Sequence, residues 1–308
     1  MATPALNPET KQPTSSQQPP STTQPTTTAN TSSDSDSEEE EQGDFTLFRE
    51  PADYYPPTPP PKITSYTSPS GTTTITLHLV GHSPLEAHHL WNGGRVVADL
   101  FYSQPSLVAG KTVFELGAGA GLPSLVAASL GAKKVVVTDY PDPELVEVMW
   151  KNVKGCVGLI PGVSEDEVDE TRLNIAAEGY VWGADPGRVL QHLDDEDKAK
   201  GFDLLILADL LFRHSEHGNM LKSVRSTLKK SKDSRAYVVF TSYRPWLQHK
   251  DLAFFDLARE QGFVVEKVLE KKTERPLFEE DPGDEEVRKT VTGWTLRWPD
   301  EECEDAAK

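Results

Sequence analysis

The sequence predicts an α/β fold with a doubly wound, mostly parallel sheet of seven strands that ends in an antiparallel hairpin. From residue 112 onward, short apolar runs that suit buried strands alternate with helix-forming stretches. This alternation is typical of a parallel sheet with helices on both faces. A glycine-rich turn follows the first of these strands. The last two strands have no helix between them, so we expect them to pair antiparallel at one edge of the sheet.

The first strand and its following helix are the most informative part of the chain. Residues 112–116 form a short apolar run that leads directly into Gly117, Gly119 and Gly121. The helix-forming stretch 124–130 comes next and stops at a glycine, as helices commonly do. A glycine turn between a strand and a helix N-terminus lets the backbone approach a ligand without side chains in the way.

A carboxylate follows the second predicted strand, 134–138. Asp139 comes 20 residues after Gly119 (139 − 119), where doubly wound folds hold a ribose by its hydroxyls. The glycine pattern is G-x-G-x-G, and not the G-x-G-x-x-G of dinucleotide enzymes. Glu115 stands just before it, which disfavours a pyrophosphate and suits a sulfonium or ammonium cation. The sequence therefore favours S-adenosylmethionine over NAD as the cofactor.

The remaining elements follow from the same patterns. The alternation of apolar residues in 71–80 predicts a hairpin or edge strand, and the apolar spacing in 91–102 predicts a helix. Asp142 and Pro143 suit the cap and first position of a helix over 143–153. Later strands are predicted at 173–181, 202–209, 235–242, 262–268 and 291–298, and later helices at 220–228 and 252–261.

Composition divides the chain into one domain and two tails. Residues 1–44 are mostly Ser, Thr, Pro and Gln and end in an acidic run, so we expect a disordered tail. The domain is expected over 45–300, with an extended, proline-rich entry at 45–62 and a solvated acidic insertion at 163–170. Residues 301–308 form an acidic C-terminal tail.

The net charge of −18 bears on which partners the protein can bind. An acidic surface repels nucleic-acid phosphates and suits basic partners. Cys156 and Cys303 are the only cysteines, too few for a disulfide framework or a metal cluster, so no metal is expected. No apolar run reaches membrane-spanning length, and the N-terminus has no signal-peptide pattern. We therefore expect a cytoplasmic, monomeric protein.

Several short motifs carry a family resemblance. They are Leu90-Trp-Asn with the Arg-Val-Val-Ala-Asp that follows, Glu115-Leu-Gly-Ala-Gly with Leu122-Pro123, Val181-Trp-Gly183 and Ala208-Asp-Leu-Leu-Phe212. With the predicted fold, they resemble the class I, seven-strand S-adenosylmethionine-dependent methyltransferases, and within that class the lysine methyltransferase-like family. Asp139-Tyr-Pro-Asp-Pro143 and Leu211-Phe-Arg-His-Ser-Glu-His217 are similar to fungal members that methylate the N-terminal amine and a lysine of elongation factor 1-alpha. The resemblance runs from about Phe45 to Trp298.

This resemblance implies roles for the matching residues. The implied cofactor site consists of Trp91 at the methionine end, the backbone of Gly117, Ala118 and Gly119 beneath the cofactor, Asp139 at the ribose hydroxyls, Trp182 near the adenine, and Ala208 in the pocket wall. Asp209 and Phe212 match the family's Asp-x-x-Phe. Asp209 would orient the acceptor amine or accept its proton, and Phe212 would line the channel.

The residues taken without the resemblance leave alternatives open for individual positions. Trp91 and Trp182 could be core aromatics, and Asp139 could be only a helix cap. His214 and His217 are expected at the surface of a polar loop.

Several functions remain possible for the chain as a whole. The leading hypothesis is a protein N-methyltransferase. An α-amino group, with a pKa of roughly 7.7–8.0, is partly neutral at physiological pH, whereas a lysine near about 10.4 is not, which favours an N-terminal acceptor. A small-molecule, nicotinamide-like N-methyltransferase is the alternative, although a proline-rich entry suits a lid poorly. A nucleic-acid methyltransferase is disfavoured by the charge and by Leu-Leu where such enzymes carry prolines. A non-enzymatic binding module is disfavoured by the intact glycine turn.

Overall fold

The computed structural model describes residues 59–163 and 170–304, which lie in one compact unit, Pro56–Lys308. The expected tail at 1–44 lies outside these residues, as does most of the expected insertion at 163–170. Within the described part of the chain, no helix has the length and apolar character needed to cross a membrane.

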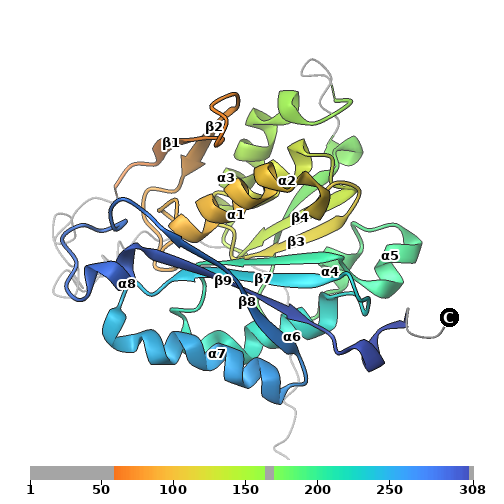
Figure 1. The fold of residues 1–308 in the computed structure, drawn as a ribbon. Coiled ribbons are helices and arrows are strands. Elements are labelled where there is room, and N and C mark those ends of the chain that lie inside the picture. The colour runs from red at the N-terminus through yellow and green to blue at the C-terminus, as the bar shows by residue number, and fades with distance from the viewer. Residues whose placement is uncertain (1–58, 164–169, 305–308) are drawn as a thin grey trace, which may run out of the picture. The chain divides into compact units, whose positions relative to one another are not determined.

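Seven strands of the described residues form one sheet in the order β5-β4-β3-β6-β7-β9-β8 (Figure 1). Their bounds are β3 Thr112–Leu116, β4 Lys134–Asp139, β5 Ile175–Gly179, β6 Leu204–Ala208, β7 Arg235–Thr241, β8 Val264–Lys272 and β9 Thr290–Arg297. The first five strands in this order pair in parallel, and β9 pairs antiparallel with both β7 and β8. The predicted fold class is confirmed, including the terminal hairpin. Chain order reverses between β3 and β6, so the carboxyl ends of these strands form the crevice where such sheets bind ligands.

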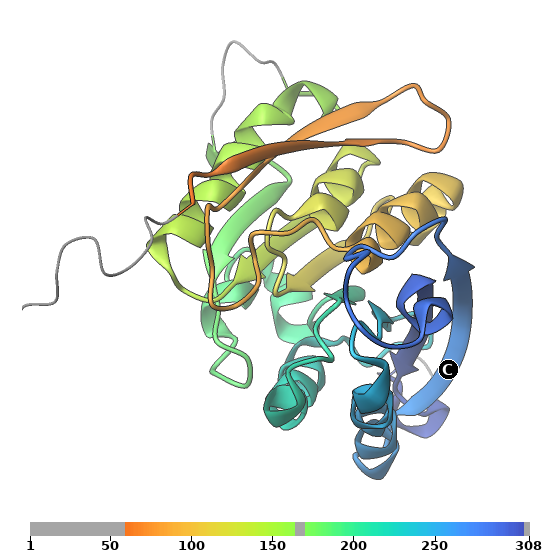
Figure 2. The ribbon, with the colours of Figure 1, turned by 90° about the vertical axis from the view of Figure 1, so that its left-hand side faces the viewer.

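Helices cover both faces of the sheet (Figures 1 and 2). One face carries α1 Asn92–Ser103, α2 Leu122–Ser129 and α3 Pro143–Gly155, and the other carries α6 His217–Thr227 and α7 Gln248–Glu260. The shorter helices are α4 Gly187–Leu190, α5 Asp195–Lys200 and α8 Glu285–Lys289. These three helices are only four to six residues long, too short to show an apolar period, and the sequence patterns did not predict them.

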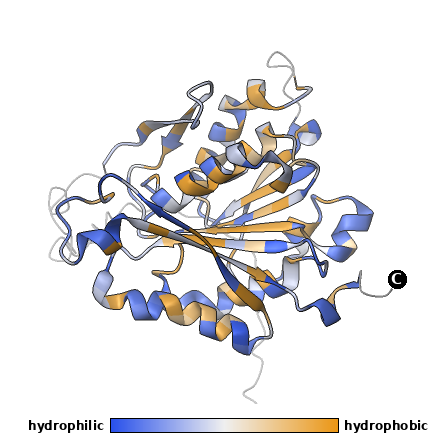
Figure 3. Cartoon of the chain, in the orientation of Figure 1, coloured by the Kyte–Doolittle hydropathy of each residue, from blue (hydrophilic) through white to orange (hydrophobic). Residues whose placement is uncertain are grey.

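The central strands are buried on both faces because alternate residues enter different hydrophobic clusters. Val113 and Val135 pack under α1 to α3, whereas their neighbours Phe114 and Val136 pack in the cluster with α6 and α7. Figure 3 shows orange, hydrophobic residues along these central strands. Continuous apolar runs are what a parallel sheet covered on both sides requires, which is why the sequence located these strands well.

A separate antiparallel hairpin, β1 Lys62–Thr67 and β2 Thr74–Leu79, lies outside the main sheet. The strand expected within 71–80 is confirmed as half of a hairpin. Its partner β1 was not predicted, and it begins at the last residue of the stretch 45–62 that was expected to be extended. The Asn152 side chain of α3 holds the hairpin, accepting a bond from the His78 N–H at 2.7 Å and donating to its carbonyl at 3.0 Å.

Other element boundaries also differ from prediction. Helix α7 starts at Gln248, four residues before the predicted start, because its polar first turn lacks an apolar periodicity. Strand β8 continues to Lys272 with mostly exposed, charged side chains and a β-bulge between Lys267 and Leu269. Cys303, in the expected C-terminal tail, is buried against the domain.

Candidate active site

A cavity of about 320 Å³ lies at the carboxyl ends of the central strands. The turn after β3, the end of β4 and the segments after β5 and β6 all contribute to its wall. The nine site residues predicted from sequence all line it, although they come from distant parts of the chain: Trp91, Gly117, Ala118, Gly119, Asp139, Trp182, Ala208, Asp209 and Phe212. Topology therefore brings the predicted residues together at one crevice.

The glycine turn needs its glycines for two reasons. Gly117, Gly119 and Gly121 have φ of +59°, +54° and +77°, in the left-handed region where a Cβ is strained. A Cβ at Gly117 would also lie 2.6 Å from Cδ2 of Leu210 and 2.9 Å from Cζ2 of Trp182. These side chains therefore pack directly on the turn, and a larger residue would displace them from the cavity wall.

Asp139 is tied to the glycine turn. Its Oδ2 accepts a hydrogen bond from the Gly119 N–H at 2.7 Å, and its Oδ1 accepts one from the Tyr140 N–H at 2.7 Å. Burial raises the pKa of Asp139, against the opposing effect of these two bonds. The alternative of a simple helix cap is wrong, because Asp142 caps α3 by accepting from the Glu144 N–H.

Glu115 has a different environment from the one we expected beside a cation. Its side chain is buried, and Oε2 accepts hydrogen bonds from the Ser124 backbone N–H at 3.0 Å and from the Ser124 hydroxyl at 2.5 Å. Burial raises the pKa of Glu115 to about 8. The carboxyl group of Glu115 therefore fixes the first turn of α2 to β3, since the N–H groups of a helix start need acceptors.

Asp209 joins three elements at the cavity wall. It has a φ of +54°, and its side chain is buried. Oδ2 accepts from the Gly93 N–H of α1 at 2.5 Å, and Oδ1 accepts from the Thr241 N–H at the end of β7 at 2.9 Å. Burial raises the pKa of Asp209 to about 7, although both bonds favour the ionised form. The carboxylate thus holds the start of α1 against the ends of β6 and β7.

Three aromatic rings contact Trp91 in the cavity wall. The Trp91 ring stacks on Phe212 with centroids 5.9 Å apart, and it meets Tyr243 and Phe278 edge-on at 4.9 Å and 5.6 Å. Its indole N–H donates to the Glu86 carbonyl at 3.0 Å. Trp91 is thus a half-buried wall residue, and not a plain core aromatic. No sequence motif predicted Tyr243 or Phe278, which lie in loops more than 100 positions along the chain from the glycine turn.

The turn that carries Trp182 is fixed from the opposite face of the sheet. Gly183 has a φ of +77°, and its N–H donates to the Ser223 hydroxyl of α6 at 2.7 Å. Trp182 is half-buried and packs on Gly117, so it is also part of the wall.

The two histidines after β6 do not line the cavity. His214 contacts the buried Asp251, with Nε2 and Oδ1 2.7 Å apart. His217 was expected at the surface, but it is buried in the first turn of α6 and faces the Leu211 carbonyl at 2.8 Å. Burial lowers the pKa of His217. The polar residues before His217 suggested a surface loop, but α6 begins at His217 itself and buries its side chain.

Comparison with known proteins agrees with this geometry. The lysine methyltransferase family model matches residues 82–261. A protein N-terminal and lysine N-methyltransferase, efm7, of Neurospora crassa is 61% identical over 263 residues, which is 85% of this chain and 91% of that protein. The proteins of the same description from Gibberella zeae and Schizosaccharomyces pombe are 57% and 43% identical, each covering 83% of this chain and 96% of its relative. The chain belongs to the lysine methyltransferase family of class I S-adenosylmethionine-dependent methyltransferases.

Proposed function

We propose that this protein methylates the N-terminal amine and an adjacent lysine of elongation factor 1-alpha. The observation that carries the proposal is the convergence of nine predicted residues from distant segments on one cavity. The similarity at 139–143 and 211–217 to fungal enzymes with this substrate supports the choice of acceptor, as do relatives described as protein N-terminal and lysine N-methyltransferases. We place the activity in the cytoplasm, with the chain as a monomer whose methyltransferase domain spans 45–300.

The cavity suits S-adenosylmethionine. Its volume falls in the range of small-molecule sites. Asp139 keeps unused lone pairs on both oxygens, because an ionised carboxylate has about four acceptor positions and the backbone takes two of them. Asp139 would hold the ribose hydroxyls above the glycine backbone. Trp91 would lie at the methionine end and Trp182 at the adenine, with Ala208 in the wall. When bound, the cofactor supplies a methyl group on a sulfonium.

The chain itself must deliver a neutral amine and keep water away. Stacked rings of Trp91 and Phe212 form an apolar wall that would exclude water from the acceptor. Asp209 positions this wall, because its bond to the Gly93 N–H fixes the start of α1 two residues after Trp91. An α-amino group already has a neutral fraction at physiological pH, so orientation is its main requirement. A lysine must in addition lose its proton on entering a desolvated site.

Mass spectrometry of elongation factor 1-alpha from a deletion strain tests the acceptor. The N-terminal peptide should lose its methyl groups in the strain that lacks this gene. Wild-type protein and Asp142→Asn should restore them, whereas Asp139→Ala should not. Asp142 is the matched control because it is exposed and near Asp139, and because asparagine caps helices as well as aspartate does. A fully methylated N-terminal peptide in the deletion strain would exclude this acceptor and favour a small-molecule substrate.

A further inference from the structure

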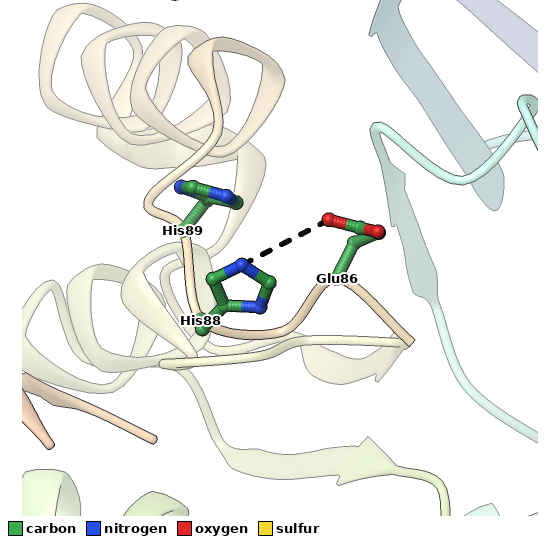
Figure 4. Close-up of side chains that lie close together, drawn as sticks. All are labelled: Glu86, His88 and His89. Carbon is green, nitrogen blue, oxygen red and sulfur yellow. Dashed lines mark ion pairs between the residues drawn. The ribbon is translucent and has the colours of Figure 1, made fainter. Parts of the chain in front are cut away.

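Two histidines and a glutamate converge in the loop between β2 and α1. One donor atom from each of Glu86, His88 and His89 lies within 4.8 Å of the others, and all three side chains are half-buried. Figure 4 shows the three side chains directed toward a common space, with Nε2 of His88 4.0 Å from Oε2 of Glu86. The His88 and His89 rings have centroids 4.1 Å apart. Neither the glycine-turn motif nor the proposed methyl transfer uses this cluster as a unit.

The loop is held in shape by its own hydrogen bonds. Glu86 has a φ of +65°, uncommon for a residue with a side chain, and its N–H donates to the Ser83 carbonyl at 3.0 Å. The Arg213 side chain donates to the Pro84 carbonyl at 2.8 Å, and the Trp91 indole donates to the Glu86 carbonyl. The three donor groups are thus carried by a closed loop fixed at several points, so a ligand would find them already gathered.

We propose that Glu86, His88 and His89 form a binding site for Zn²⁺. Two imidazoles and one carboxylate are a ligand set that zinc accepts, and three protein ligands leave a fourth position open. Nε2 of His88 is the ligating atom, because it faces Glu86. Its Nδ1 accepts a long 3.3 Å bond from the Ser83 N–H, and this weak bond is released when the ring's proton moves to Nδ1. The ring of the exposed His82 lies 5.5 Å from that of His88 and is a further imidazole beside the cluster.

The site adjoins the proposed cofactor cavity. Glu86 and His89 line that cavity, and the Glu86 carbonyl holds Trp91. Bound zinc therefore adds positive charge to the cavity wall and fixes the loop that supports Trp91. Like charges repel more strongly in a partly desolvated site than in water. Zinc should consequently weaken binding of the cationic S-adenosylmethionine more than binding of S-adenosylhomocysteine, whose sulfur is uncharged.

Calorimetric titration of the full, tag-free chain with Zn²⁺ tests the site directly. We expect one zinc ion per chain, with no comparable binding of Mg²⁺, which prefers oxygen ligands. His88→Ala and Glu86→Gln should each weaken zinc binding by about tenfold or more. His249→Ala is the matched control, because His249 is an exposed histidine in the first turn of α7 and should leave zinc affinity unchanged. Co²⁺ as a spectroscopic probe should give visible absorption bands that His88→Ala removes.

Two results would overturn the zinc site. The first is zinc affinity that is equal in wild type, His88→Ala and Glu86→Gln, with melting temperatures showing that the variants are folded. The second is failure of the wild-type chain to bind zinc at all. The comparison of the two cofactor forms rests on the proposed function, whereas the zinc titration does not. If zinc weakens the binding of S-adenosylmethionine and S-adenosylhomocysteine equally, the proposed charge effect on the cavity is rejected. The zinc site itself is tested by the titration alone.

Discussion

Replacing Asp209 by asparagine should destabilise the fold by about 1–3 kcal/mol. The carboxylate accepts from two buried backbone N–H groups, of Gly93 and Thr241, through different oxygens. Asparagine has one carbonyl oxygen, so one N–H must face an amide NH₂ and stay unpaired. An unpaired buried donor costs about 1–3 kcal/mol. The left-handed backbone at this position is not an added cost, because asparagine tolerates it.

The loss of stability caused by Asp209→Asn should depend on pH. The pKa of Asp209 is raised from 3.8 to about 7, so the folded state retains a proton that the unfolded state releases. The stability from this proton is fully present below the unfolded pKa and is lost as pH rises through the folded pKa. The asparagine variant has no such titration. The difference in unfolding free energy between wild type and variant should therefore be larger near about pH 5 than near about pH 8.

Urea denaturation at the two pH values measures this effect, with Asp142→Asn as the matched substitution. Asp142 is an exposed helix cap, where an asparagine oxygen replaces the carboxylate with little loss. A second measurement separates roles in the site. Asp209→Ala should lower turnover more than cofactor affinity, because Asp209 holds the start of α1 and is not one of the residues proposed to bind the cofactor. An Asp209→Asn variant within about 0.5 kcal/mol of wild type would refute the reasoning, since this is the range of ordinary surface substitutions.

Three further predictions concern the cofactor, the tail and the buried glutamate. Asp139→Ala should weaken calorimetric S-adenosylmethionine binding by about tenfold or more for each ribose bond lost, while NAD should not bind, and unchanged affinity would disprove the assigned pocket. A chain that begins at Gly43 should keep its melting temperature and its rate on a peptide substrate. In the full-length chain, hydrogen exchange should find residues 1–44 unprotected. A large loss in either the melting temperature or the rate would mean that the tail acts in folding or catalysis. Because the pKa of Glu115 is raised from 4.5 to about 8, wild-type unfolding free energy should fall as pH rises between these values, and Glu115→Gln should show a flatter profile. Equal pH slopes in the two proteins would contradict this.

The elements that the sequence predicted well are those with a local physical signal. Strand β6 is a continuous apolar run, and Gly117, Gly119 and Gly121 occupy backbone conformations that favour glycine, so both could be identified without knowledge of the fold. The cavity residues became predictable because parallel strands place their carboxyl ends at one edge.

What the sequence could not predict depends on contacts between distant segments. Tyr243 and Phe278 reach Trp91 from loops that have no periodicity of their own. The role of Asp209 at the acceptor stays a prediction. Its two backbone partners lie 116 and 32 residues away in the sequence, so the local pattern could not predict that its carboxyl group joins them. Strand β1 has only Ile63 and Tyr66 as large apolar residues, and it depends on pairing with β2.

The charged, bulged strand β8 has a consequence for how copies of this chain behave in solution. A long strand at the edge of a sheet offers unpaired backbone groups to the edges of other molecules and can nucleate aggregation. Here Glu266, Lys267 and Glu270 project from the outermost strand, and the bulge between Lys267 and Leu269 breaks the flat register that a second sheet would need. Val268 is 51% exposed at the bulge, and the other exposed side chains of β8 are charged, so β8 does not present a continuous apolar surface. The sheet edge thereby protects the chain against edge-to-edge polymerisation.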